Sequence, residues 1–174
     1  MKDPHTGVSD MTGTHGLITI ALLGPGLLAG VASPARADAG TCSAPRHVAF
    51  DTPGRNTRMD VRLCLLHGTP TRGAYAHVAW ARGGADNDDG ERKFDALTLH
   101  YHLQRHNENV SLGTCDLAPR VNEATTGAYK CEKVELRVPA AGGWSADGYL
   151  EYNLDRDGAG MKRVDLRGSP VVAH

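Results

Sequence analysis

The stretch Leu97-Thr-Leu-His-Tyr-His-Leu-Gln104 decides the fold, because apolar and polar side chains alternate along it without interruption. A period of two places the three leucines and the tyrosine on one face of an extended chain, and the four polar side chains on the other. This pattern is typical of a β-strand that is buried on one side and exposed to water on the other. The sequence therefore predicts a sheet with one apolar face.

The same alternation recurs along the chain, between turns rich in Gly, Asp and Pro. No segment keeps a helical period for long enough to predict an α-helix. We predict further strands at 58–65, 75–80, 110–114, 129–138, 149–154 and 161–166. Seven or eight short strands with such turns predict an all-β fold, either an antiparallel β-sandwich or a small barrel.

The N-terminal segment has the pattern of a removable signal peptide. An uncharged apolar run from Leu17 to Val31 leads into Ala35-Arg-Ala37, which matches the A-x-A cleavage pattern. A transmembrane anchor is the alternative, but a spanning helix needs about 20 apolar residues and this run is shorter and broken by glycine and proline. We predict a signal peptide over 1–37, cut after 37 or 39, and one secreted, extracellular domain over 38–174 without a membrane anchor.

Four cysteines follow the export segment, and an even number in an oxidising compartment predicts two disulfides. They are Cys42, Cys64, Cys115 and Cys131. Three pairings are possible, and we favour Cys42 with Cys64 and Cys115 with Cys131 because each joins neighbours in the sequence. Their phase against the apolar residues predicts that the bridges lie outside the core or at a sheet end. No C-x-x-C spacing suggests a zinc knuckle.

Charge argues against nucleic acid as a partner. The 174 residues include 19 Lys and Arg against 20 Asp and Glu, for a formal net charge of −1. Binding to phosphate depends on clustered cations, and no basic run in this chain is longer than a pair.

The segment Asn153-Leu-Asp-Arg-Asp157-Gly is the sharpest candidate for a metal site. Asn153, Asp155 and Asp157 match the first three oxygen ligands of a calcium loop, and Gly158 follows where such a loop turns. The second half does not match, because Val164 stands where a bidentate glutamate is required. A strand that runs into a hairpin turn is the alternative explanation. Calcium at this segment is the candidate cofactor, and we predict no other.

Two other clusters have both a functional and a structural explanation. His100 and His102 share a strand face and could offer imidazoles to zinc or copper, with His106 just beyond, or they could simply line the wet side of a strand. The acidic segment 86–91 is either a solvated connection or a binding loop.

Two tryptophans are assigned different roles. Trp80 lies in the apolar phase of its strand and is predicted to be core. Trp144 follows two glycines, so an exposed indole there could stack on a sugar or anchor a partner protein, whereas the alternative is that it covers an open end of the sandwich.

Several segments resemble known proteins. They are AYAHVAW (74–80), FD (94–95), CD (115–116), GWSADG (143–148) and LRGSP (166–170). With the export segment, they make the chain similar to small secreted proteins of high-GC actinobacteria that carry no assigned function, and this resemblance implies no particular activity. In export, size and two disulfides the chain also resembles the secreted subtilisin inhibitors of those bacteria, which implies protease inhibition.

No motif identifies the function, so three hypotheses remain. The first is a non-enzymatic module that binds an extracellular protein or glycan. The second is a small hydrolase that uses a carboxylate and a histidine from 100–106, although the chain has no G-x-S-x-G or H-E-x-x-H motif. The third, protease inhibition, predicts a rigid exposed loop braced by a disulfide. An enzyme predicts a concave pocket where a histidine and a carboxylate converge with perturbed pKa values.

Overall fold

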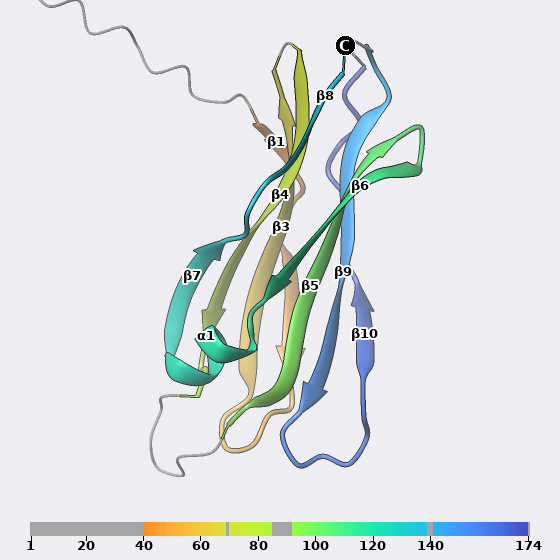
Figure 1. Cartoon of the computed structure of the whole chain (residues 1–174). Coiled ribbons are helices and arrows are strands. Elements are labelled where there is room, and N and C mark those ends of the chain that lie inside the picture. The colour runs from red at the N-terminus through yellow and green to blue at the C-terminus, as the bar shows by residue number, and fades with distance from the viewer. Residues whose placement is uncertain (1–39, 69, 85–91, 139–140, 174) are drawn as a thin grey trace, which may run out of the picture. The chain divides into compact units, whose positions relative to one another are not determined.

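The predicted strands form two antiparallel sheets in the computed structural model of the chain, which describes residues 40–68, 70–84, 92–138 and 141–173 (Figure 1). These residues belong to the compact unit Arg36–His174, and the description that follows is of this unit alone. The predicted signal peptide 1–37 and the acidic segment 86–91 lie outside the described residues. The all-β fold class is confirmed, and the sheets are not joined into a closed barrel.

Sheet A has six strands and is built on one long hairpin, in which β3 (Thr57–His67) pairs with β4 (Thr71–Ala81). Two short strands extend the β3 side, namely β1 (Gly40–Cys42) and β2 (Arg46–Phe50). Two others extend the β4 side, namely β7 (Thr126–Lys130) and β8 (Val134–Arg137).

Sheet B has four strands in the order β10-β9-β5-β6. They are β5 (Phe94–Arg105), β6 (Glu108–Asp116), β9 (Trp144–Leu154) and β10 (Lys162–Asp165). The β5–β6 hairpin turns through His106 and Asn107, which both have positive φ, as a two-residue hairpin turn of the primed type requires. One short helix, α1 (Ala118–Glu123), connects β6 to β7 and so leads the chain from sheet B to sheet A.

The core lies between the two sheets, which face each other in Figure 1. Sheet B contributes the apolar face predicted from the alternation: Leu97, Leu99 and Leu103 are fully buried, and Tyr101 is 1 % exposed. Sheet A contributes the matching apolar residues of β3 and β4, including the predicted core residue Trp80. The opposite, outer face of each sheet is therefore free to carry polar side chains.

Both predicted disulfides are present, Cys42–Cys64 and Cys115–Cys131. The first joins neighbouring strands β1 and β3 on the outer face of sheet A, as predicted. The second joins β6 of sheet B to the residue after β7 of sheet A, and both of its cysteines belong to the core cluster. It therefore links the two sheets, which differs from the expectation that both bridges would stay outside the core.

Three details of the predicted elements were wrong. The segment 129–138 is not one strand, because the chain leaves β7 at Cys131 to form the disulfide and enters β8 only at Val134. The position of Cys131 was predicted from the alternation of apolar and polar residues along one unbroken strand, and this break ends that alternation. The short elements β1, β2 and α1 were not predicted, and the described residues form ten strands where seven or eight were expected.

Candidate functional site

A polar cleft of about 280 Å³ lies on the outer face of sheet B, and we call it the outer cleft. Residues of all four strands of the sheet contribute to it. The lining residues are His102, Gln104, Asn109, Asp147, Gly148, Tyr149, Arg163, Asp165 and Leu166. The cleft is thus built on the wet face of the same strands whose other face forms the core.

Strand register brings these residues together from distant parts of the sequence. His102 pairs with Asp147 across β5 and β9, and Tyr149 pairs with Asp165 across β9 and β10. Directly paired residues of antiparallel strands share a face, with Cβ atoms about 5 Å apart. A histidine and a carboxylate therefore converge in one concave site.

Tyr149 is fixed in place at one side of the cleft by three neighbours. Its ring stacks on the His100 ring with centroids 4.7 Å apart and meets the edge of His102 at 5.8 Å. The Arg163 guanidinium carbon lies 3.6 Å from the centroid of the Tyr149 ring. Because these groups already pack on its ring, Tyr149 offers its hydroxyl to a ligand rather than a free aromatic face.

The two histidines of the predicted pair have different surroundings. His100 Nε2 lies 3.1 Å from Glu151 Oε2, which orients its ring. Burial lowers the pKa of His102, Asp147 opposes this shift, and His100 and Arg163 add to the lowering. His102 is therefore held in its neutral form to lower pH than an ordinary histidine, so that it can accept as well as donate a hydrogen bond.

The remaining polar groups nearly balance one another in charge. Gln104 donates from its amide to Asn109 at 2.8 Å, and Arg163 is paired with Asp165 at 2.7 Å. Asp147 accepts a hydrogen bond from the Gly148 backbone N–H through one oxygen. The cleft thus presents amide, imidazole, phenol and carboxylate groups side by side, a set that suits a ligand with many hydroxyl groups.

The prediction that His100 and His102 share a face is confirmed. His106 lies apart from them in the β5–β6 turn, where its backbone N–H donates to the Gly143 carbonyl at 2.8 Å. Across the described ranges, no group of three or more His, Cys, Asp or Glu side chains is placed to hold a metal ion. Zinc or copper binding at this face has no third ligand among those residues.

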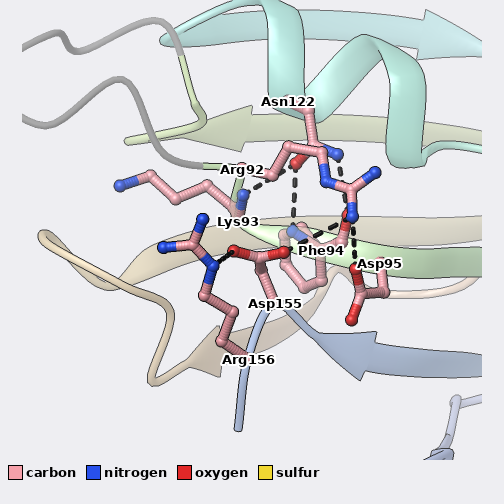
Figure 2. Close-up of polar contacts among 7 residues, drawn as sticks. All are labelled: Arg92, Lys93, Phe94, Asp95, Asn122, Asp155 and Arg156. Atoms are coloured by element: carbon pink, nitrogen blue, oxygen red, sulfur yellow. Dashed lines mark hydrogen bonds and ion pairs between the residues drawn. The ribbon is translucent and has the colours of Figure 1, made fainter.

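The predicted calcium ligands lie at the end of β9, where two of them already have cationic partners. Figure 2 shows the Asp155 carboxylate between Arg92 and Arg156, at 3.4 Å and 3.6 Å. Asp157 lies 2.7 Å from the Lys162 ammonium and accepts a hydrogen bond from the Ala159 N–H. The side-chain oxygen of Asn153 is buried without a hydrogen-bond partner. Calcium binding here stays a prediction.

Figure 2 also shows what holds this end of the molecule together. The Asn122 side-chain oxygen accepts hydrogen bonds from the Lys93 and Phe94 backbone N–H groups, and its amide donates to the Phe94 carbonyl. Asn122 therefore docks α1 on the start of β5. The polar cluster around it has a structural explanation.

The expectation of an exposed indole at Trp144 is wrong. Trp144 is the first residue of β9, is 2 % exposed and belongs to the core cluster. The two glycines before it end the loop rather than extend it, and the pairing of Trp144 with Val172 seals this end of the sheet. A side chain buried to this extent has no surface with which to bind a partner.

Sequence reasoning missed most of the cleft. Tyr149, Asp147 and Arg163 carry no motif, and each enters the site only because β9 and β10 pair beside β5. The available signal was the alternation in 144–154, whose polar phase places Asp147, Tyr149 and Glu151 on one face. That signal predicts a shared face but not the neighbouring strand.

The described part of the chain contains no helix that is long and apolar enough to cross a membrane.

Comparisons with known proteins assign no relative. No protein-family model, no curated protein and no solved structure matches the chain.

Proposed function

We propose that the protein is exported and acts outside the cell as a binding module, with a glycan as its ligand and the outer cleft as its binding site. The observation that carries this proposal is the mixture of hydrogen-bond donors and acceptors that line the cleft. A sugar hydroxyl both donates and accepts, so its recognition needs donors and acceptors side by side. His102, the Gln104–Asn109 amide pair and Asp147 supply this mixture.

The composition of the cleft favours a glycan over a protein as the ligand. Protein interfaces bury a central patch that is rich in aromatic and apolar side chains. Leu166 is the one aliphatic side chain among the lining residues, and the Tyr149 ring is already covered by His100 and Arg163. Export is supported by the apolar N-terminal run and by two disulfides, which persist in oxidising compartments.

The test is an NMR titration of the oxidised protein with a panel of hexasaccharides from cellulose, chitin, xylan, mannan and laminarin. We expect at least one probe to shift the resonances of His102, Asp147 and Tyr149. Asp147→Asn should weaken that binding roughly tenfold or more, because a hydrogen bond to a charged group contributes about 1.5–3 kcal/mol.

Glu108→Gln is the matched control, since it also neutralises an exposed carboxylate of sheet B, on β6, and lies outside the cleft lining. It should leave the affinity within a factor of about two. Failure of every probe to shift cleft resonances at millimolar concentration would refute glycan binding at this site. Shifts confined to another surface would refute the placement.

Hydrolysis of the bound glycan is a second candidate, and one observation favours it. His102 and Asp147 converge in a concave site, and His102 has a lowered pKa, as an acid–base pair would require. Incubation of each hexasaccharide with the protein, followed by chromatography, separates the two functions. Shorter products that disappear with Asp147→Asn would establish an enzyme, whereas binding without products supports the module.

A further inference from the structure

The outer face of sheet A carries a row of basic side chains that the sequence does not place together. Arg62 on β3 pairs with His77 on β4, and His77 pairs with Lys130 on β7. All three residues are exposed, and we call them the cation row. Since adjacent strands lie about 4.8 Å apart, the row spans about 10 Å, which is wider than one phosphate group.

The positive charge of the cation row has little compensation. In the described residues, no carboxylate lies within ion-pair distance of Arg62 or Lys130. Asp60 is the acidic residue of this face of β3, two positions from Arg62, and His47 Nδ1 contacts its carboxylate at 2.5 Å. Burial, Lys130 and Arg62 lower the pKa of His77, so the middle of the row lies in a positive potential.

The row is also held in place by its surroundings. The Lys130 ammonium lies 4.3 Å from the centroid of the Tyr75 ring, and the His77 ring meets the same tyrosine edge-on at 5.2 Å. Tyr75 is 7 % exposed and packs with the Cys42–Cys64 disulfide. Because the strands and the Tyr75 ring already restrict the side chains of the row, these side chains lose less conformational entropy when a ligand binds.

The surroundings of the row argue against two kinds of anionic partner, a membrane surface and a single-stranded nucleic acid. Insertion into a membrane surface uses exposed apolar side chains, and binding of single-stranded nucleic acid uses free aromatic faces. Among the described residues, the exposed large apolar side chains lie on β6, before β10 or in the C-terminal segment, at Val110, Leu112, Met161 and Val171. Tyr75, the aromatic side chain that contacts the row, is buried under Lys130.

We propose that the cation row is a binding site for a linear polyol-phosphate polymer, whose successive phosphate groups contact Arg62, His77 and Lys130. This site lies on the opposite sheet from the outer cleft, so it does not depend on glycan binding there. Arg62 donates from a planar guanidinium, and Lys130 supplies a point charge. A polymer fits better than a single phosphate because the row presents its donors on three strands.

Calorimetric titration of the oxidised protein with a synthetic poly(glycerol phosphate) oligomer tests this proposal. We expect binding at low ionic strength. The logarithm of the binding constant should fall linearly with the logarithm of the salt concentration, with a slope of roughly 0.7 per phosphate contact. Arg62→Gln and Lys130→Gln should each weaken binding roughly tenfold and flatten this slope. Asp60→Asn should tighten binding, an outcome that misfolding cannot imitate.

Arg137→Gln is the matched control, since it removes one cation from the same sheet at the end of β8. Thr71, its partner on β4, is six positions from His77, or roughly 20 Å along the strand. The control is compared at about 0.15 M salt, where the Debye length is about 8 Å and so much shorter than this separation. A loss with Arg137→Gln equal to that with Arg62→Gln would overturn the site. So would tighter binding to anionic phospholipid vesicles, to oligothymidine or to inorganic phosphate than to the oligomer.

The pKa of His77 gives an independent readout, through NMR shifts of its ring protons. The groups that face it are Arg62 from β3, Lys130 from β7 and Tyr75 from its own strand. Bound phosphate groups favour the imidazolium, so this pKa should rise when the oligomer is saturating. An unchanged pKa of His77 under those conditions would show that the polymer lies elsewhere.

Discussion

His77 and His102 lie on the outer faces of different sheets, yet one physical property unites them. Burial lowers the pKa of each from 6.5, and cationic neighbours lower it further. The folded protein therefore binds protons at these two sites less readily than the unfolded chain does. At any pH between the pKa values of these histidines in the folded protein and their pKa in the unfolded chain, protonation favours unfolding.

We accordingly expect the free energy of unfolding to decrease as the pH falls from about 7.5 to about 5.5. The decrease begins near the pKa of an unfolded histidine and ends below the folded pKa values. Replacing either histidine with glutamine should reduce the difference between the urea midpoints measured at those two pH values. Variants that keep the full pH dependence of the parent protein would contradict this assignment.

Two strands contain a glycine directly opposite an aromatic residue. Gly127 on β7 pairs with Trp80, and Gly113 on β6 pairs with Tyr101. A Cβ atom at either glycine would overlap the aromatic ring of its partner. Glycine weakens a strand by itself, but here it lets a large ring lie flat across the neighbouring strand.

Gly127→Ala should therefore destabilise the protein, since the Trp80 ring would have to leave its site and the hydrogen bond from its indole N–H to the Ala124 carbonyl. We expect a loss of about 1–3 kcal/mol and a Tm lower by about 5 °C in a thermal melt. Gly68→Ala is the control, because its nearest contact would be the Thr71 carbonyl at 3.8 Å. Equal melting of both variants would rule out the packing argument.

The strands that could be predicted are those whose burial follows a simple alternation. The apolar phase of 97–103 and the phase that contains Trp80 both point into the core. The alternation failed at 129–138, because a disulfide interrupts the strand and resets its phase. It could not identify β1, which is only three residues long and is held by its pairing with β3.

The candidate site could be predicted only in part for a related reason. Alternation placed His100 and His102 on one face, but the groups that give that face its chemistry come from β9 and β10. The order of strands in a sheet depends on long-range packing, so the alternation within one strand does not identify its neighbour. The same holds for the cation row, whose members are separated in sequence and meet only through register.

At the scale of the whole molecule, the two disulfides have different structural roles. Cys42–Cys64 joins neighbouring strands of sheet A, whereas Cys115–Cys131 joins the two sheets at their edge. Their sequence separations are similar, at 22 and 16 residues. Chain entropy alone therefore predicts similar contributions from both bridges, about 3 kcal/mol each.

The pair Cys115→Ala and Cys131→Ala should lower the free energy of unfolding in urea by about 3 kcal/mol or more, since it also leaves small cavities in the core. The pair Cys42→Ala and Cys64→Ala is the comparison, and it should cost no more than the first pair. A larger loss from the second pair would show that the link between the sheets is not the more important bridge.

The pairing of β5 with β9 has a kinetic consequence. Leu99 and Leu150 meet in sheet B although about 50 residues separate them, and contacts of such high order make nucleation slow. The bridge from β6 to the end of β7 shortens the path between these strands. If that cysteine pair is oxidised before the chain collapses, β9 lies nearer to β5 along the cross-linked chain. The disulfide would then speed refolding as well as stabilise the folded protein.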